Sequence, residues 1–358
     1  MPTYRSDLES IPRYVPGRPV EDVARELGID SIDKLASNEC PEEPFPEVIE
    51  VVAAAARGIN RYPDNGGYEL CNAVAAHQGL EPEEVWIGSG SSEILRCAAL
   101  AVGGRGTSAV YADPSFVMYR IATMVAGAEP IAVPLAANLD HDLDAMLSAI
   151  RDDTTIVYVC NPNNPTGGHL PGSEVTRFLD SVPERVLVIV DEAYAEYVTA
   201  DDYQTFINEA PNRPNVLVGR TFSKIYGLAG LRIGYGVASR DLIGQLRTTQ
   251  PPFAVTSVAQ AGALEAIKHQ EEVAGRRQRN AAGRDVLFAG LERLGFDPAP
   301  SQANFVYFEP ETPAGELGDA LLHRGEIVRV LGPAIRVSVG TVDENERFLE
   351  ALAAVTRP

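Results

Sequence analysis

Val186-Leu-Val-Ile-Val-Asp191 is a short run of apolar, mostly β-branched residues that ends on a carboxylate. Four similar apolar runs lie elsewhere in the chain, at Ser108–Tyr111, Pro130–Val133, Thr155–Cys160 and Asn215–Arg220. Strands have this composition when helices cover both faces of their sheet, because neither face then meets water. The runs therefore predict the central parallel strands of an α/β fold.

Segments with helical character separate these runs, as a parallel sheet requires. Those between the strands lie at Phe116–Ala126, Asp142–Ile150 and Ser173–Ser181. Nearer the start of the chain we expect helices at Glu47–Gly58, Gly67–Gln78 and Ser92–Ala101, and a strand at Val85–Ile87. The alternation predicts a mostly parallel central sheet flanked by helices, with ligands bound at the carboxyl ends of its strands.

The pattern changes on both sides of this region, which indicates a second domain. Residues 1–45 are rich in Pro and Gly and predict an arm with one short helix at Val20–Leu27. Beyond residue 255 the chain predicts a long helical stretch at Val255–Gly290, strands at Ala303–Phe308, Ile327–Val330 and Ile335–Val339, and a helix at Glu344–Val355. We therefore expect a large domain over residues 46–255 and a small α+β domain over residues 256–358, to which part of residues 1–45 belongs.

Composition and charge exclude several classes of function. The 358 residues carry 30 Lys and Arg against 50 Asp and Glu, a formal net charge of −20 at pH 7. Such a charge repels nucleic acid phosphates and anionic membranes, so neither is expected as a partner. The four cysteines lack metal-ligand spacing, so no metal site is expected. With no membrane-length apolar run and no secretory pattern in Met1–Ser10, we expect a cytoplasmic enzyme.

Two sequence strings indicate an anion site and a stiff loop at strand ends. Gly88-Ser-Gly-Ser-Ser-Glu93 follows a predicted strand and opens a helix, so its N–H groups and the helix dipole favour an anion. Its sixth position is Glu93 instead of the glycine found in the dinucleotide-binding fingerprint. Cys160-Asn-Pro-Asn-Asn-Pro-Thr-Gly167 follows another strand, and its two prolines stiffen a loop of amide side chains. A functional role fits this loop better than a generic turn.

Two further strings carry ionisable groups. Asp191 ends its strand inside the predicted core, where a carboxylate is costly unless it pairs with a cation or a protonated heterocycle. Lys224 lies within Arg220-Thr-Phe-Ser-Lys-Ile-Tyr-Gly-Leu-Ala-Gly-Leu-Arg232, a partly apolar stretch that contains other cations. Such surroundings lower the pKa of an amine and make it a nucleophile and proton carrier. Apart from Lys224, the chain contains only Lys34 and Lys268.

In this order, the four strings resemble those of the fold-type I pyridoxal 5′-phosphate (PLP) aminotransferases of classes I and II, over essentially the whole chain. Arg61-Tyr-Pro-Asp64 and Leu228-Ala-Gly-Leu-Arg-Ile-Gly234 are similar to the subgroup of histidinol-phosphate and aromatic amino acid aminotransferases. The resemblance implies PLP as the cofactor. It also implies transfer of an amino group to a 2-oxo acid such as 2-oxoglutarate.

The resemblance further implies roles for residues around the cofactor ring. Lys224 would hold the cofactor covalently and move a proton during the reaction. Asp191 would pair with the pyridine nitrogen and keep it protonated. Tyr194 and Asn164 would hydrogen-bond the ring oxygen, and Phe116 would stack on the ring face.

The same resemblance implies ligands for the phosphate, the substrate and the neighbouring subunit. The implied phosphate ligands are Ser91, Ser92, Thr221, Ser223 and Arg232. Arg336 would clamp the substrate carboxylate or phosphate in bidentate fashion. Further candidate substrate ligands are Arg329, Tyr14 and Asn38. Tyr62 would reach the cofactor phosphate of the other subunit, which implies a homodimer.

Three features bear on the identity of the amino donor. Histidinol-phosphate enzymes commonly carry a Pro-Tyr segment whose hydroxyl bonds the substrate phosphate, whereas this chain has Pro252-Phe253. The stretch Arg329–Arg336 is also short, and both features are more similar to the aromatic relatives. Asp113-Pro-Ser-Phe116 instead resembles the histidinol-phosphate form. We therefore favour an aromatic amino donor slightly, with histidinol phosphate as the alternative.

Two other functions are possible on such a scaffold. A PLP-dependent decarboxylase or lyase would use the same cofactor, but the retained Arg336 favours amino transfer. A non-catalytic binding protein is expected to have lost Lys224 or Asp191, and both are present. The sequence leaves open the pathway, any assembly beyond a dimer, and whether Tyr14 closes over the substrate.

Overall fold

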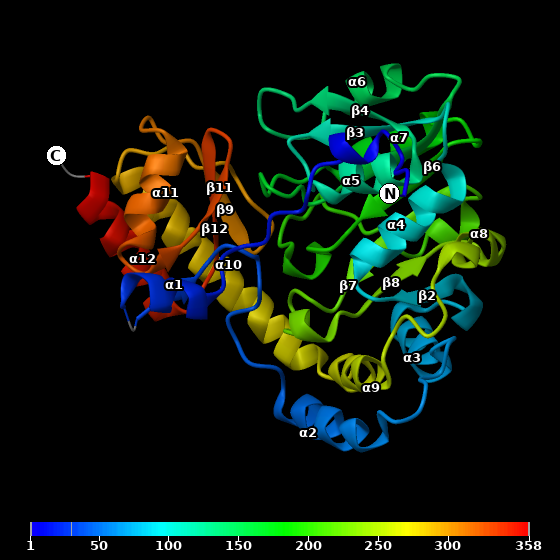
Figure 1. The fold of residues 1–358 in the computed structure, drawn as a ribbon, viewed down its shortest axis with the longest axis horizontal. Coiled ribbons are helices and arrows are strands. Elements are labelled where there is room, and N and C mark those ends of the chain that lie inside the picture. Colours follow the sequence, from blue (N-terminus) through cyan, green and yellow to red (C-terminus); the bar gives the residue numbers. More distant parts are fainter. Residues whose placement is uncertain (1, 30, 357–358) are drawn as a thin grey trace.

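A computed structural model describes residues 2–29 and 31–356, and its centre is a seven-stranded sheet (Figure 1). The strand order is β2-β8-β7-β6-β5-β3-β4. The strands are β2 (Val85–Gly88), β3 (Ser108–Asp113), β4 (Glu129–Pro134), β5 (Thr154–Cys160), β6 (Leu187–Asp191), β7 (Val216–Thr221) and β8 (Gly234–Val237). β3 to β7 pair in parallel, and β8 lies antiparallel to both β2 and β7. The predicted α/β fold with a mostly parallel sheet is confirmed.

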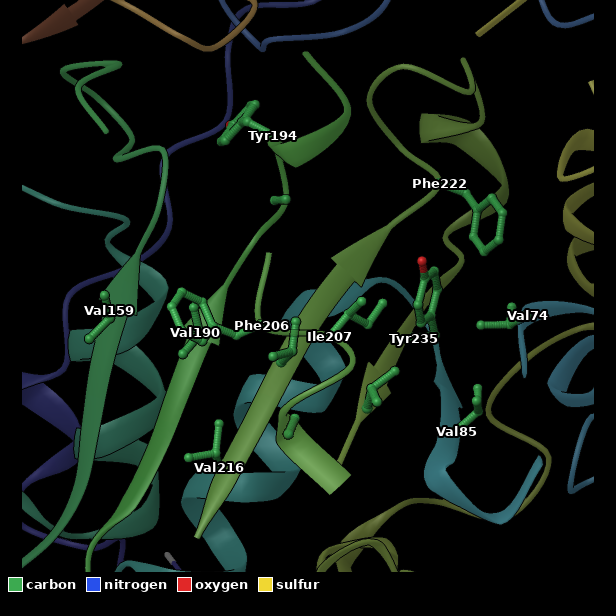
Figure 2. Close-up of a cluster of buried hydrophobic side chains, with 14 of the residues drawn as sticks. Val74, Val85, Val159, Val190, Tyr194, Phe206, Ile207, Val216, Phe222 and Tyr235 are labelled. Carbon is green, nitrogen blue, oxygen red and sulfur yellow. The ribbon is translucent and has the colours of Figure 1, made fainter. Parts of the chain in front are cut away.

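Helices cover both faces of this sheet, as the apolar composition of the strands requires. They are α2 (Pro46–Ala55), α3 (Tyr68–Gln78), α4 (Ser91–Val102), α5 (Met118–Ala126), α6 (Leu143–Ser148), α7 (Gly172–Ser181), α8 (Arg240–Leu246) and α9 (Ser257–Ala266). Successive residues of one strand enter opposite cores: Val157 and Val159 lie in one apolar cluster, and Tyr158 lies in the other. Figure 2 shows the first cluster, in which Val159, Val190 and Val216 project from neighbouring strands.

The second domain is built from both ends of the chain. Its antiparallel sheet has the order β11-β12-β9, formed by β9 (Phe305–Phe308), β11 (Arg329–Leu331) and β12 (Ala334–Ser338). A short parallel pair joins β1 (Asp33–Lys34) to β10 (Glu326–Ile327). The helices are α1 (Val20–Leu27), α10 (Gln270–Arg293), α11 (Ala314–Leu322) and α12 (Val342–Thr356). Leu35 packs into the same apolar core as Phe308 and Phe348, so the N-terminal segment is part of this domain.

The N-terminal arm connects the two regions (Figure 1). Arg5 donates hydrogen bonds to the carbonyl oxygens of Met124 and Val125 at the end of α5, while α1 lies beside the small domain. The division between the domains at residue 255 stays a prediction, and α9 beyond it packs against α2. Within the described residues, no helix is both long and apolar enough to cross a bilayer.

Most element boundaries agree with the sequence pattern, and the differences have physical causes. The strand β8 was not expected because its sequence, Gly-Tyr-Gly-Val, is not a β-branched run. Gly234 is required there, since a Cβ on it would lie 2.7 Å from the backbone nitrogen of Ser91. The segment expected as one strand at Ile327–Val330 is divided between β10 and β11. Helices α8 and α11 were also missed; both are short, at seven and nine residues, so their apolar periodicity extends over few turns.

Glu326 is a buried carboxyl group at the junction of the two chain ends. It lies opposite Asp33 in the β1–β10 pair, and Asp33 accepts hydrogen bonds of 2.6 and 2.9 Å from Arg347. Oε2 of Glu326 has no hydrogen-bond partner among the described residues. Burial, together with the charge of Asp33, raises the pKa of Glu326 from 4.5 to about 8. The folded protein therefore favours the neutral form of this side chain.

This environment predicts a pH-dependent effect of Glu326→Gln. Because the folded-state pKa is raised, the folded protein keeps a proton that the unfolded chain loses, so the stability from this site declines as pH rises from about 4.5 to about 8. Above that range, we expect Glu326→Gln to raise the free energy of unfolding by about 1–3 kcal/mol. Near pH 5 the gain should be small. Thermal or urea unfolding at both pH values measures it.

The matched control is Glu350→Gln, at an exposed glutamate of α12. It should have little effect on stability at either pH. Equal effects of Glu326→Gln at low and high pH would contradict the account of this buried carboxyl group.

Candidate active site

The sequence motifs meet at the carboxyl ends of β5, β6 and β7. Cys160 pairs with Asp191 across β5 and β6, and Asp191 pairs with Gly219 across β6 and β7. The loop that carries Asn164 and the loop that carries Lys224 therefore leave the sheet on either side of Asp191. This is the edge at which ligands bind in parallel α/β sheets.

The Lys224 side chain is enclosed between the large domain and the N-terminal segment. Its Nζ donates a hydrogen bond of 3.4 Å to the carbonyl oxygen of Ser37 and lies 5.6 Å from the centroid of the Tyr194 ring. Burial, followed by the charge of Arg336, lowers the pKa of Lys224 from 10.5 to about 8. The Lys224 amine therefore loses its proton more readily than an ordinary lysine, as a nucleophile requires.

Asp191 is buried and hydrogen-bonded by neutral groups. Its Oδ2 accepts a bond of 2.8 Å from the Tyr119 hydroxyl, and its Oδ1 accepts one of 3.2 Å from the N–H of Ala193. Burial raises the pKa of Asp191 from 3.8 to about 6, while these two bonds oppose the rise. In the part of the chain that the structure describes, Asp191 forms no ion pair. It is thus a carboxylate suited to a protonated heterocycle.

Tyr194 stands just beyond the end of β6, where Figure 2 shows it past the strand that carries Val190. Its hydroxyl accepts a hydrogen bond of 2.9 Å from Nδ2 of Asn38. Asn38 adopts a positive φ of 54°, and its N–H donates to Oγ of Ser338 at 2.9 Å. Burial raises the pKa of Tyr194, so its hydroxyl remains protonated and able to donate.

Arg336 is a desolvated guanidinium that has no carboxylate partner within the described residues. Nη2 donates to the carbonyl oxygen of Ala36 at 2.8 Å, and Nη1 donates to Oδ1 of Asn164. Its Nε finds no acceptor in the described chain. The guanidinium carbon lies 5.2 Å from the Phe305 ring centroid, and burial lowers the pKa of Arg336 to about 10. Such a group suits an incoming carboxylate or phosphate.

An anion cradle lies at the start of α4. Ser91 and Ser92 are its first residues, and the N–H groups of a helix's first turn have no acceptor within the helix. Nη1 of Arg232 donates to Oγ of Ser223 at 3.3 Å, which brings a cation and a hydroxyl to the same place. Gly90 has φ +75°, and a Cβ there would lie 2.7 Å from Nη2 of Arg232. The positive φ favours glycine, and the close contact shows that the end of the Arg232 side chain lies directly against Gly90.

Two predicted cofactor ligands have further contacts within the protein. The Thr221 hydroxyl donates to the carbonyl oxygen of Ile233 at 3.4 Å and accepts from the N–H of Ser223 at 3.1 Å, so it supports the cradle from inside the loop. Phe116 is half-buried just before α5 and meets Tyr119 edge-on, with ring centroids 5.7 Å apart. Its ring is thus held against Tyr119, whose hydroxyl contacts Asp191.

The remaining predicted residues lie at the surface or in the arm. Tyr62 is 82% exposed and stacks on Phe253, with ring centroids 4.5 Å apart. Nη2 of Arg329 donates a bond of 2.7 Å to the carbonyl oxygen of Val15 and so holds the N-terminal arm. The neighbouring Tyr14 is 55% exposed.

Sequence reasoning missed three groups that shape this site. Tyr119 contacts Asp191, Asn304 donates to the carbonyl oxygen of Asn38 at 3.1 Å, and Ser338 holds the same asparagine. No motif identifies them, because each reaches the site through tertiary packing. The nearest signal for Tyr119 is its position one helical turn after Phe116.

These groups fit one cofactor. A partly buried amine of lowered pKa, a buried carboxylate without a cation, and an anion cradle match the aldehyde, ring nitrogen and phosphate of PLP. The Arg232 guanidinium beside Gly90 and the N–H groups at the start of α4 together suit a phosphate group. The fold and the site together define a PLP-dependent enzyme of fold type I, and the unpaired Arg336 adds a position that can bind an anionic substrate.

The chain belongs to the aminotransferase class I and II family, whose sequence model matches residues 31–352. A histidinol-phosphate aminotransferase of Moorella thermoacetica is 42% identical over 361 residues, which cover 99% of this chain and 93% of that protein. An aromatic amino acid aminotransferase of Corynebacterium glutamicum is 39% identical, with 98% of each chain covered. The structure of a histidinol-phosphate aminotransferase from Sinorhizobium meliloti in complex with PLP aligns at a TM-score of 0.91, with 28% identity and 99% and 97% of the two chains covered.

These similarities confirm the family, the PLP cofactor and amino transfer. The two curated relatives that match over nearly their full length are named as aminotransferases, so they support transfer over the decarboxylase or lyase alternative. A non-catalytic binding protein is likewise not supported.

The burial and contacts of Arg336 predict a specific kinetic defect of the Arg336→Lys variant. Arg336→Lys keeps a positive charge but removes the planar fork that can bind a carboxylate through two bonds. We expect the KM for 2-oxoglutarate to rise about 10–100-fold, the equivalent of one or two charge-assisted hydrogen bonds, with a smaller change in kcat. Steady-state kinetics at fixed amino donor measure both constants.

Arg120→Lys is the matched control, since Arg120 is exposed on α5. Its KM and kcat should equal those of the wild type. If Arg336→Lys leaves the KM for 2-oxoglutarate within about twofold, less than the loss of one such bond, the substrate-binding role of Arg336 is wrong.

Proposed function

We propose that this aminotransferase takes its amino group from histidinol phosphate and passes it to a 2-oxo acid such as 2-oxoglutarate. The observation that carries the proposal is full-length similarity, at 42% identity, to a protein named histidinol-phosphate aminotransferase. Further relatives with that name are 41–42% identical over nearly the whole chain. These relatives support the alternative drawn from the sequence more strongly than the slight preference for an aromatic donor.

Bound PLP supplies an electron sink that stabilises negative charge on the carbon carrying the amino group. In our proposal, Lys224 would hold the cofactor covalently and would also carry the proton of the reaction. Its lowered pKa of about 8 supports both roles. Asp191 holds the ring nitrogen protonated, because its buried carboxylate gains a cationic partner there. Tyr194 and Asn164 donate to the ring oxygen.

The remaining ligands follow from the same geometry. The cofactor phosphate is held by the cradle of Ser91, Ser92, Ser223 and Arg232, with Thr221 behind it, and Phe116 covers one ring face. Arg336 binds the anionic group of either substrate, since its guanidinium has a free Nε and no carboxylate partner in the described chain. Asn38 supports this pocket through Tyr194. Tyr14 and Arg329 border it from the arm and β11.

We also propose a homodimer in which Tyr62 completes the site of the other subunit. Tyr62 and Tyr68 are 82% and 68% exposed, and Ile59 is 67% exposed, so the loop between α2 and α3 presents an apolar surface. A second copy that covers this surface would remove it from water. The net charge of −20 disfavours nucleic acid and anionic membranes as partners. We also propose that the protein is cytoplasmic and acts on small-molecule substrates.

An aromatic amino acid as the main donor is the second candidate. Phe253 lacks the hydroxyl with which a tyrosine could bind a substrate phosphate, and it stacks on Tyr62. The aromatic amino acid aminotransferase at 39% identity supports this candidate over the same length.

Donor profiling separates the two candidates. The holoenzyme is mixed with histidinol phosphate, phenylalanine, tyrosine or glutamate, and the half-reaction is followed by the absorbance of the cofactor. We expect histidinol phosphate to convert the cofactor at least about tenfold faster than either aromatic amino acid, because the relatives at 41–42% identity are named for this donor. Faster conversion by phenylalanine or tyrosine would instead establish the aromatic candidate. Glutamate serves as the control for an active enzyme.

A further inference from the structure

Tyr119 provides the one side-chain hydrogen bond that Asp191 receives within the described residues. Its hydroxyl donates to Oδ2 at 2.8 Å, and the other oxygen, Oδ1, accepts only from the backbone N–H of Ala193 at 3.2 Å. Tyr119 is fully buried, so no water competes for this bond. A buried phenol that donates to a buried carboxylate is a charge-assisted bond in surroundings of low polarity.

Contacts with neighbouring aromatic rings restrict the orientation of the Tyr119 side chain. Its ring stacks on Tyr158, with centroids 4.7 Å apart and planes 18° apart, and it meets Phe116 edge-on at 89°. Its carbonyl oxygen accepts a bond of 2.8 Å from Oγ1 of Thr123, one turn further along α5. The start of α5 therefore fixes both the ring that covers the cofactor and the hydroxyl that holds Asp191.

The Tyr119 hydroxyl opposes the influences that raise the pKa of Asp191. Burial and, less strongly, the charge of the adjacent Glu192 raise the pKa of Asp191, which is about 6. The Tyr119 hydroxyl is the strongest influence that lowers the pKa of Asp191, ahead of the Ala193 N–H and the charge of Lys224. Burial and the charge of Asp191 raise the pKa of Tyr119 itself, so the phenol keeps its proton and remains a donor.

We propose that Tyr119 is a positioning residue that keeps Asp191 ionised and aims its carboxylate at the cofactor ring nitrogen. It acts through Asp191 and contacts neither substrate nor reacting atoms. The inference rests on the role proposed for Asp191 and adds the group that makes this role possible. Without the hydroxyl, Oδ2 of Asp191 loses its only donor in the described chain, and the carboxylate is free to rotate or to take up a proton.

The test compares two substitutions that each remove one buried hydroxyl and keep the ring. Tyr119→Phe removes the donor to Asp191. Tyr158→Phe is the matched control, because Tyr158 stacks on Tyr119, is equally buried, and its hydroxyl has no partner among the described residues. Both apoproteins are titrated with PLP, and the Kd, the pH dependence of the cofactor absorbance and kcat are measured.

We expect Tyr119→Phe to raise the Kd for PLP and lower kcat by about tenfold each, the equivalent of one hydrogen bond to a charged group. The pH at the midpoint of the cofactor's absorbance change should also differ from the wild-type value. Tyr158→Phe should match the wild type in all three measurements. Tyr119→Phe leaves a buried carboxylate oxygen without its donor, so we expect its apoprotein to melt at a lower temperature than that of Tyr158→Phe. The Kd and the absorbance are therefore measured at a temperature at which both apoproteins are folded. Should Tyr119→Phe lower the apoprotein melting temperature while the Kd and the absorbance stay at wild-type values, Tyr119 is only structural.

Asp191→Asn and the double variant Tyr119→Phe/Asp191→Asn complete the design. If Tyr119 acts through Asp191, its substitution adds little once Asp191 has lost its charge. Full additivity, or a Tyr119→Phe variant that matches Tyr158→Phe while Asp191→Asn is impaired, overturns the inference and leaves the proposed function intact. Wild-type affinity and rate in Asp191→Asn overturn the role of Asp191 itself, and the inference with it.

Discussion

A carboxylate buried at the end of a central strand is the constraint on which this site depends. Asp191 is held by neutral donors alone in the described chain, and burial raises its pKa to about 6. Burying such a charge is costly unless a cation meets it. The parallel sheet places Asp191 at the centre of the site, because β6 ends between the loops that carry Asn164 and Lys224. A protonated ring nitrogen beside Asp191 would offset the cost of burying this carboxylate.

The other half of the site depends on contacts between the two ends of the chain. Asn38, from the N-terminal segment, joins Tyr194 of the large domain to Ser338 of β12. Arg336 of β12 bonds the backbone of Ala36 and the Asn164 amide. These bonds hold the small domain against the cofactor edge of the large one. They also gather cationic groups inside a chain of net charge −20, so that an anionic substrate is attracted to the site and not to the surface.

Site residues in motifs at strand ends could be predicted from the sequence. Site residues that reach the site through tertiary contacts could not. The sequence placed Asn164, Asp191 and Lys224 correctly at one sheet edge, because each follows a recognisable buried strand and parallel strands end together. β8 escaped prediction because glycines demanded by contact with α4 replaced the β-branched pattern. Tyr119 and the bond from Arg329 to Val15 depend on how distant segments pack, and no local pattern records this. The sequence motifs also did not identify the amino donor. Single positions such as Phe253 favoured an aromatic amino acid, whereas full-length similarity favours histidinol phosphate.

The central claim is that Lys224, enclosed beside Asp191, is the residue that carries the cofactor. The most direct measurement is borohydride reduction of the holoenzyme, followed by proteolysis and mass spectrometry of the labelled peptide. With only two other lysines in the chain, the assignment is unambiguous. The account predicts a pyridoxyl group on the peptide that contains Lys224 and none on Lys34 or Lys268. A label on either of those residues, or no covalent label at all, would contradict it.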